Sequence, residues 1–224
     1  MVNEKFLVID TETTNSLEDP ICYDVGVAVV DGKGEVFETR SYAVEEIFGY
    51  PDLMSSAFYA SKLPLYTQEI KEGTREVRKY KQIRLEVFNL LYGYGIKRVS
   101  AHNARFDYLA LNLTQRFLTC SKYRYFFPYG VEIWDTLNMA RQVLGKSPAY
   151  HKFCLENGFT TKRHQSRFTA EILYRFISNQ PDFVGAHIGL QDVLIEKEIL
   201  AYCLAQYPNI DGRLWKNRDS NSDN

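Results

Sequence analysis

The chain has 224 residues, of which 45 % are hydrophobic and 25 % are charged, and its formal net charge is −1. This length suits one domain with a sizeable core, and the composition is ordinary for a soluble globular protein. Proteins that coat nucleic acid without specificity are strongly basic, so the near-neutral charge argues against that class. It is compatible with an enzyme that gathers acidic residues at its active site.

The cysteines and the apolar runs argue against several other classes of protein. The four cysteines lie far apart and form no CxxC pair, which disfavours a zinc site or a dense disulfide framework. The N-terminal residues lack the basic stretch and long apolar run of a signal peptide, and no apolar run approaches the length of a membrane span. We therefore expect free thiols and a cytoplasmic location.

The first part of the chain is predicted to form a β-meander. Short runs of strand-forming residues predict strands over 6–9, 24–30 and 36–42. The Asp-Gly pair at 31–32, between the second and third strands, is typical of a hairpin turn. Residues 45–72 show no regular pattern.

From residue 74 onward, helices are predicted to alternate with strands. Apolar spacing predicts a helix over 74–91, with Thr74 as its N-cap. Later strands are predicted over 98–101 and 131–134, and later helices over 103–118, 135–144, 168–178 and 190–205. A meander followed by such alternation predicts one α/β domain over 1–215, with a mixed sheet flanked by helices. The polar residues 216–224 are expected to form a disordered tail.

Two carboxylates follow the first predicted strand. Asp10 and Glu12 are two residues apart, so in a strand they point to the same side and can converge. Converging carboxylates attract hard cations such as Mg²⁺ or Mn²⁺, which prefer oxygen ligands. An acidic turn after a strand is the alternative, and the pair alone favours it. Thr13 and Thr14, directly after the pair, strengthen the functional interpretation.

A second polar cluster runs from His102 through Asn103 and Phe106 to Asp107. It follows the strand predicted over 98–101, which places Asp107 in the first turn of the next helix. The alternative role for Asp107 is charge complementarity at a helix N-terminus, which is common.

The third cluster pairs His187 with Asp192. Residues five apart on one continuous helix point to different faces, because five residues turn through more than one revolution. The pair makes sense when His187 lies on the loop before a helix and Asp192 lies in its first turns. Gly189 suits such a junction.

Together the three clusters resemble the DEDD exonucleases, in particular the DEDDh branch, which includes the proofreading subunit of bacterial DNA polymerase III and many stand-alone enzymes. The matching stretches are Asp10-Thr-Glu12-Thr-Thr, His102-Asn-Ala-x-Phe-Asp107 and His187-x-x-x-x-Asp192, in the family's order. The segment 133–141 looks like the family's strand-plus-helix unit. Stand-alone versions carried by bacteriophages are also similar, and for such a protein the location would be the host-cell cytoplasm.

The chain departs from the family pattern in two places. Asn15 stands where the family usually has glycine, and asparagine tolerates left-handed backbone better than most residues. The small residue of the third motif is Gly189, in a shifted register. The segment from Tyr207 to Asp211 mimics the YxxxD motif of the DEDDy branch, but Pro208 would have to lie in the first turn of that helix.

The resemblance implies a ribonuclease H-like fold with a mixed five-stranded sheet flanked by helices, forming one exonuclease domain. It implies that Asp10, Glu12, Asp107 and Asp192 hold two divalent cations, Mg²⁺ or Mn²⁺. His187 would be the general base that activates water. The products would be nucleoside monophosphates released from the 3′ end.

Contacts to the substrate are expected from residues around these motifs. The expected contact residues are Thr13, Thr14, His102, Asn103 and Phe106. Phe58 and Tyr59 are suited either to stacking on bases or to the core. The basic segment 162–167 either grips phosphates or is a solvated charged loop.

Three rival functions remain open at this stage. A non-catalytic nucleic-acid clamp would be expected to lose at least one of the five motif residues, and all five are present. A replisome accessory subunit would need a polymerase-binding tail, and none of convincing type is found. An exoribonuclease is not separated by sequence, because discrimination depends on contacts to the 2′ position. The resemblance favours DNA with a single-stranded or frayed 3′ end.

Overall fold

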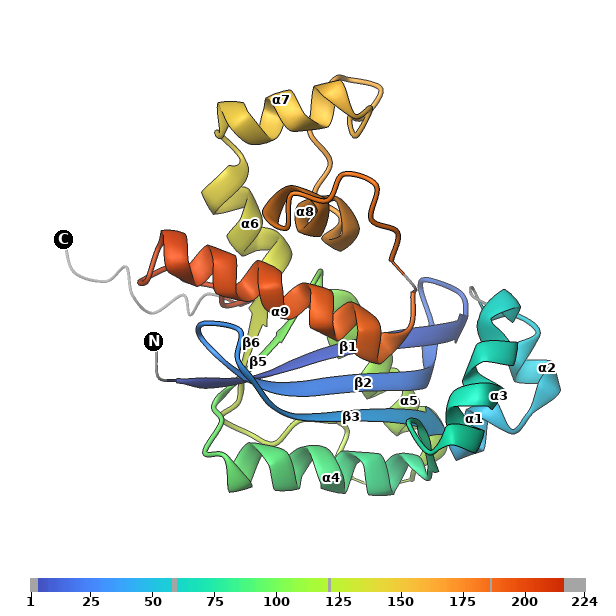
Figure 1. Ribbon diagram of the computed structural model, residues 1–224. Coiled ribbons are helices and arrows are strands. Elements are labelled where there is room, and N and C mark those ends of the chain that lie inside the picture. Colours follow the sequence, from blue (N-terminus) through green and yellow to red (C-terminus); the bar gives the residue numbers. More distant parts are fainter. Residues whose placement is uncertain (1–3, 58–59, 121, 186, 216–224) are drawn as a thin grey trace.

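The computed structural model describes residues 4–57, 60–120, 122–185 and 187–215 (Figure 1). The aromatic pair at 58–59 and the predicted tail at 216–224 lie outside the described residues. None of the described helices is both long and apolar enough to cross a membrane. The four cysteines are free thiols, as expected.

A mixed sheet forms the centre of the molecule, and the α/β prediction is confirmed. Its strand order is β4-β3-β2-β1-β5-β6. The strands are β1 (Lys5–Asn15), β2 (Pro20–Asp31), β3 (Val36–Val44), β4 (Glu76–Arg78), β5 (Arg98–Ala101) and β6 (Glu132–Asp135). The meander β1-β2-β3 is antiparallel, whereas the β3-β4, β1-β5 and β5-β6 pairs are parallel.

The described part of the sheet has six strands, where five were expected. The extra strand is β4, whose central residue Val77 pairs with Ala43 of β3. The helix predicted over 74–91 therefore begins later, as α4 (Tyr80–Gly93), and Thr74 is not its N-cap. Lys79 takes the N-cap position, and Gln82 closes a capping box there. Strand pairing thus overrides the helical periodicity of the first few residues.

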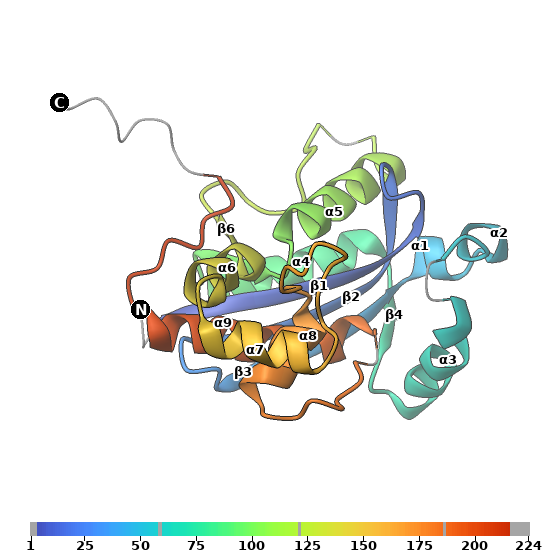
Figure 2. The same cartoon turned by 90° about the horizontal axis from the view of Figure 1, so that it is seen from above.

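Helices cover both faces of the sheet (Figure 1). One face packs against α4 and α5 (Ala104–Leu118), and the other against α9 (Gly189–Gln206) with α6 (Thr136–Leu144) and α8 (Ala170–Ile177). Viewed from above, α7 and α8 lie over the same side of the sheet as α9, and α2 and α3 lie beyond one end of the long strands (Figure 2). The remaining helices are α1 (Glu45–Phe48), α2 (Pro51–Met54), η1 (Ala60–Lys62), α3 (Leu63–Glu72) and α7 (Pro148–Glu156).

The sequence interpretation missed the helices in two regions, 45–72 and 148–156. Both regions carry a local start signal, a proline in the first turn of α2, α3 and α7. In α7 the Ser147 side chain also accepts a hydrogen bond from the Tyr150 backbone. These helices are short, so their apolar periodicity is weak.

Strand β1 contributes alternate residues to two separate cores. Leu7 and Ile9 face α4 and α5, whereas Phe6 and Val8 face α6, α8 and α9. Asp10 continues the second series, so the alternation of the strand directs it toward α9. The strand ends at Asn15, whose φ of 70° confirms that asparagine can take the left-handed turn.

Strand β2 lets the N-terminus of α9 approach the sheet directly. Gly26 lies opposite Asp10 in the β1–β2 ladder. A Cβ built on Gly26 would lie 2.2 Å from the Gly189 carbonyl carbon, closer than any real contact of this kind. The missing side chain therefore makes room for the first turn of α9 beside Asp10.

Candidate active site

Carboxylates from three elements gather where β1 meets the start of α9. Asp10 and Glu12 of β1 and Asp192 of α9 each offer an oxygen atom, and these atoms lie within 4.8 Å of one another. Asp107, in the first turn of α5, lies outside that group of three but close enough for its charge to raise the pKa values of Asp10 and Glu12. The motif residues that are distant in sequence are thus neighbours in space.

Asp107 is held in place by β1. Its Oδ1 accepts hydrogen bonds from the Thr11 backbone N–H at 3.1 Å and from the Thr11 hydroxyl at 2.9 Å. Thr11 stands between Asp10 and Glu12, so this clamp ties the helix carboxylate to the strand that carries the other two. Asp107 is therefore positioned by Thr11, in addition to any favourable interaction of its charge with the N-terminus of α5.

Burial and mutual repulsion make the carboxylates difficult to ionise. Burial is the largest cause in each case, and it raises the pKa of Asp10 well above its ordinary value. It raises the pKa of Glu12 to about 9, of Asp107 to about 7 and of Asp192 to about 6. Groups held this way need either protons or cations, since like charges cannot all ionise at such short separations.

His187 occupies the loop before α9, with a left-handed φ of 52°. It lines a cavity of about 460 Å³ together with Asp10 and Asp192. Its Nε2 lies 3.8 Å from a carboxylate oxygen of Glu171 on α8, and Glu171 also accepts the Gly185 backbone N–H at 3.1 Å. The histidine and Asp192 thus face one cavity from opposite sides of the loop-to-helix junction.

Sequence reasoning missed a fifth acid, Glu196. It lies one turn after Asp192 on α9, is 2 % exposed and lines the same cavity. One of its oxygens has no hydrogen-bond partner among the described residues. After burial, its charge is the largest cause of the raised pKa of Asp10. The four-residue spacing from Asp192 was the available signal, because such residues share a helix face.

The expected substrate-contact residues fall into two groups. Thr13 and Phe106 are half-buried and Asn103 is exposed, so all three remain accessible. Thr14 is buried, and its hydroxyl bonds to Ser56 Oγ at 2.8 Å and to the Leu53 carbonyl.

The ring of His102 is engaged within the protein. Its Nδ1 lies 3.0 Å from Thr136 Oγ1, and its Nε2 lies 2.8 Å from the Phe168 carbonyl oxygen. Burial lowers the pKa of His102, which favours the neutral ring. These contacts support a role in shaping the turn before α5.

A buried ion pair lies beside Glu12 and anchors α9. Asp24, opposite Glu12 in the β1–β2 ladder, pairs with Arg75 and accepts the Tyr66 hydroxyl at 2.7 Å. The same carboxylate accepts the Gly189 backbone N–H at 3.1 Å. The charge of Asp24 raises the pKa of Glu12, and that of Arg75 lowers it. The pair therefore fixes the helix start and also shapes the electrostatics of the site.

No protein-family model and no curated protein matches this sequence. Among solved structures, a zinc-bound complex of E. coli exonuclease I with single-stranded DNA matches with a TM-score of 0.57 and 14 % identity. A further exonuclease I structure gives 0.58 at 16 % identity, and a product-bound form gives 0.58 at 15 %. The protein shares its fold with an exonuclease. Each match covers 92 % of this chain but only 42–44 % of the matched chain, so this chain spans less than half of exonuclease I.

The raised pKa values predict how the cation-free protein responds to pH. Unfolded carboxylates titrate near 4, whereas those of Asp192, Asp107 and Glu12 titrate at about 6, 7 and 9 in the fold. Their stabilising contribution is complete below the unfolded values and is lost as pH rises through the folded ones. We expect the Tm in excess chelator to fall from pH 6 to about pH 9, and saturating Mg²⁺ to reduce that fall.

Asp10→Asn should reduce the fall of the Tm with pH in excess chelator, and it should raise the Tm at pH 8 under the same conditions. The matched control is Glu35→Gln, an exposed carboxylate at the β2–β3 hairpin, which should leave the slope unchanged. Differential scanning calorimetry provides the measurement. A chelated wild-type protein whose Tm rises over this range would contradict the electrostatic description of the site.

Proposed function

We propose that the protein is a divalent-cation-dependent 3′-5′ exonuclease that releases nucleoside monophosphates from single-stranded DNA. The observation that supports this most directly is the convergence of Asp10, Glu12 and Asp192, with Asp107 and His187 beside them, in a fold shared with an exonuclease. DNA is favoured over RNA because the matched enzyme is described in complex with single-stranded DNA.

The donor set fits hard divalent cations, because the cluster offers only carboxylate oxygens, from buried Glu12 and half-buried Asp10 and Asp192. Asp10, Glu12, Asp107 and Asp192 would hold two such ions, Mg²⁺ or Mn²⁺. When bound, the ions would lower the pKa of the attacking water and stabilise the charge on the leaving oxygen. The unpartnered oxygen of Glu196 places a further acceptor at the edge of the same cavity.

His187 is assigned the role of general base. Its imidazole accepts the proton of the attacking water as the water oxygen bonds to the last phosphorus of the strand. The bond from that phosphorus to the 3′ oxygen of the preceding nucleotide breaks, and this oxygen takes up a proton. The products are a nucleoside 5′-monophosphate and a strand with a new 3′ hydroxyl. Glu171, near Nε2, orients the ring for this transfer.

The accessible motif residues are assigned to the terminal nucleotide. Thr13, Asn103 and Phe106 have exposed or half-exposed side chains and stand next to the motif carboxylates in the sequence. The side chains of Thr14 and His102 already have partners within the protein, so they act by shaping the backbone around the site.

The direct test compares end-labelled single-stranded DNA, duplex DNA and RNA on one gel, with Mg²⁺, with Mn²⁺ and with a chelator. We expect mononucleotides from the 3′ end of single-stranded DNA, no cleavage of a closed circular strand, and no activity in chelator. Asp10→Asn and Asp192→Asn should be inactive yet folded. Full activity in chelator, or cleavage of the circle, would overturn the proposal, and faster loss of RNA would reassign the substrate.

The role of His187 predicts a distinct kinetic phenotype. His187→Ala should lower the single-turnover rate by roughly 10²- to 10⁴-fold, the usual contribution of a positioned base. The dependence of the rate on pH should differ between the wild type and the variant, because the variant lacks the proton acceptor. Mn²⁺ affinity, measured by calorimetry, serves as the control and should be retained because the carboxylates remain. An unchanged rate and pH profile would remove the base assignment.

A further inference from the structure

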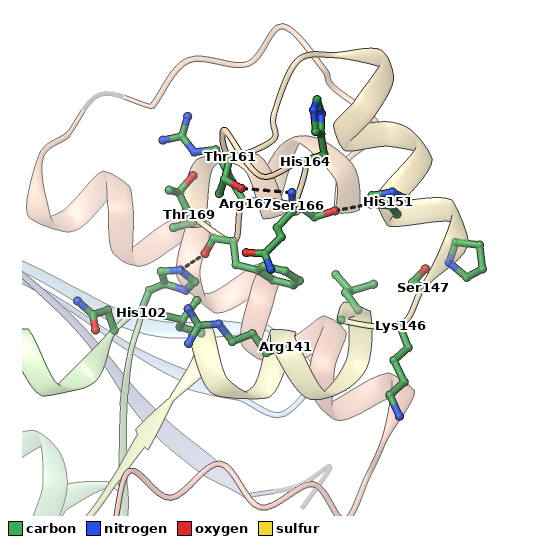
Figure 3. A pocket seen from close by; sticks show the side chains of 18 residues that line it. His102, Arg141, Lys146, Ser147, His151, Thr161, His164, Ser166, Arg167 and Thr169 are labelled. Carbon is green, nitrogen blue, oxygen red and sulfur yellow. Dashed lines mark hydrogen bonds between the residues drawn. The ribbon is translucent and has the colours of Figure 1, made fainter.

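A second and larger cavity adjoins the carboxylate cluster. It has a volume of about 1220 Å³ and lies between α6, α7 and the segment 161–170 (Figure 3). Its charged and titratable lining residues are Arg141, Lys146 and Arg167 with His102, His151 and His164. No aspartate or glutamate is among the described residues that line it. We call this cavity the basic groove.

The cations of the basic groove form no ion pairs within the part of the chain that the structure describes. Arg141, Lys146 and Arg167 are exposed, and none forms an ion pair with a described carboxylate. Nearby cations outside the groove behave differently, since Arg175 pairs with Glu171 and Lys152 lies 3.7 Å from Glu156. In a chain of net charge −1, this concave surface therefore concentrates positive charge that the fold does not neutralise.

The outer wall of the groove is preformed. The segment 159–167 folds back on itself, with the Thr161 N–H donating to the Gln165 carbonyl at 2.8 Å and the Arg167 N–H to the Phe159 carbonyl at 3.0 Å. His151 Nδ1 lies 3.1 Å from Ser166 Oγ, which fastens this turn to α7. The groove thus presents its cations on fixed backbone.

The groove is continuous with the carboxylate cavity. Arg167, Thr169 and Ala170 line both. His102 and Asn103, at the inner end of the groove, belong to the turn that leads into α5 and Asp107. A chain molecule that ends at the carboxylates can therefore extend past Arg167 toward Arg141 and Lys146.

We propose that the basic groove binds the phosphates of the strand on the 5′ side of the bond to be cut. The proposal rests on the proposed exonuclease function, which requires the rest of the strand to leave the site by some path. Cations spread over α6 (Arg141), the α6–α7 connection (Lys146) and the segment before α8 (Arg167) match a polyanion with spaced charges better than one small anion.

The test reverses charge at two groove positions that do not line the carboxylate cavity. The groove variant carries both Arg141→Glu and Lys146→Glu. The control variant carries Lys71→Glu and Lys81→Glu, which make the same charge change at exposed sites of α3 and α4. All variants carry Asp10→Asn so that the probe survives. Fluorescence anisotropy measures binding of labelled oligothymidylate, either about 15 nucleotides or about three nucleotides long, across salt concentrations.

The groove variant should lose affinity for the long probe on the order of tenfold at low salt. The slope of the logarithm of the affinity against the logarithm of the salt concentration should become shallower by about 1.4, because two phosphate contacts are lost. The short probe should bind as it does to the parent protein, and the control pair should keep the parent's affinity for both probes. Unchanged long-probe binding in the groove variant, or an equal loss in the control, would overturn the proposal.

A second measurement separates this proposal from the proposed function. In the Asp10-containing enzyme, the groove variant should keep its kcat/KM on the short substrate and lose about tenfold on the long one. A protein that degrades neither substrate refutes the exonuclease function, while the anisotropy result still decides whether the groove binds a strand. If the variant and the wild type have equal kcat/KM on the long substrate, the proposal that the groove binds the strand is overturned, and the proposed exonuclease function is unaffected.

Discussion

The backbone-to-backbone contact between β2 and the first turn of α9 is the constraint on which the site depends. Gly26 faces the same side of the sheet as its ladder partner Asp10, and a side chain there would collide with the Gly189 backbone. A Cβ on Gly189 would in turn lie 2.9 Å from the Gly26 nitrogen. Asp24 completes the junction by accepting the Gly189 N–H. With the helix start fixed against the sheet, Asp192 comes within reach of Asp10 and Glu12 one turn later.

This arrangement gathers four titratable carboxylates, and Glu196 as a fifth, at buried and half-buried positions around one cavity. Buried like charges destabilise a fold unless protons or cations neutralise them. The protein itself reduces this repulsion only in part, because the buried cation beside the site, Arg75, is already paired with Asp24. These carboxylates need protons or bound cations, and the proposed function assigns divalent cations to them. In the basic groove, Arg141, Lys146 and Arg167 form no ion pair with a described carboxylate, which under the same proposal suits the phosphates of a bound strand.

Sequence reasoning located the motif residues because local rules decide their positions. Alternation in β1 directs Asp10 toward α9, Asp107 lies in the first turn of α5, and His187 lies on the loop before α9, as the spacing indicated. The features it missed depend on contacts between distant segments. β4 forms by pairing with the edge of β3 that does not bond to β2, and the buried Arg75 pairs with the buried Asp24. The burial of Thr14 against Ser56 likewise depends on the irregular region 45–72, which showed no regular pattern in the sequence.

The central claim is that β1, α5 and α9 together form a site for two divalent cations. Electron paramagnetic resonance during a Mn²⁺ titration tests it without any substrate. Two ions about 4 Å apart are magnetically coupled, so wild type should bind two per chain with the spectrum of a coupled pair. Asp192→Asn should retain at most one ion and show no coupling. Absence of bound Mn²⁺ in the wild type, or a coupled pair that persists in Asp192→Asn, would contradict the account.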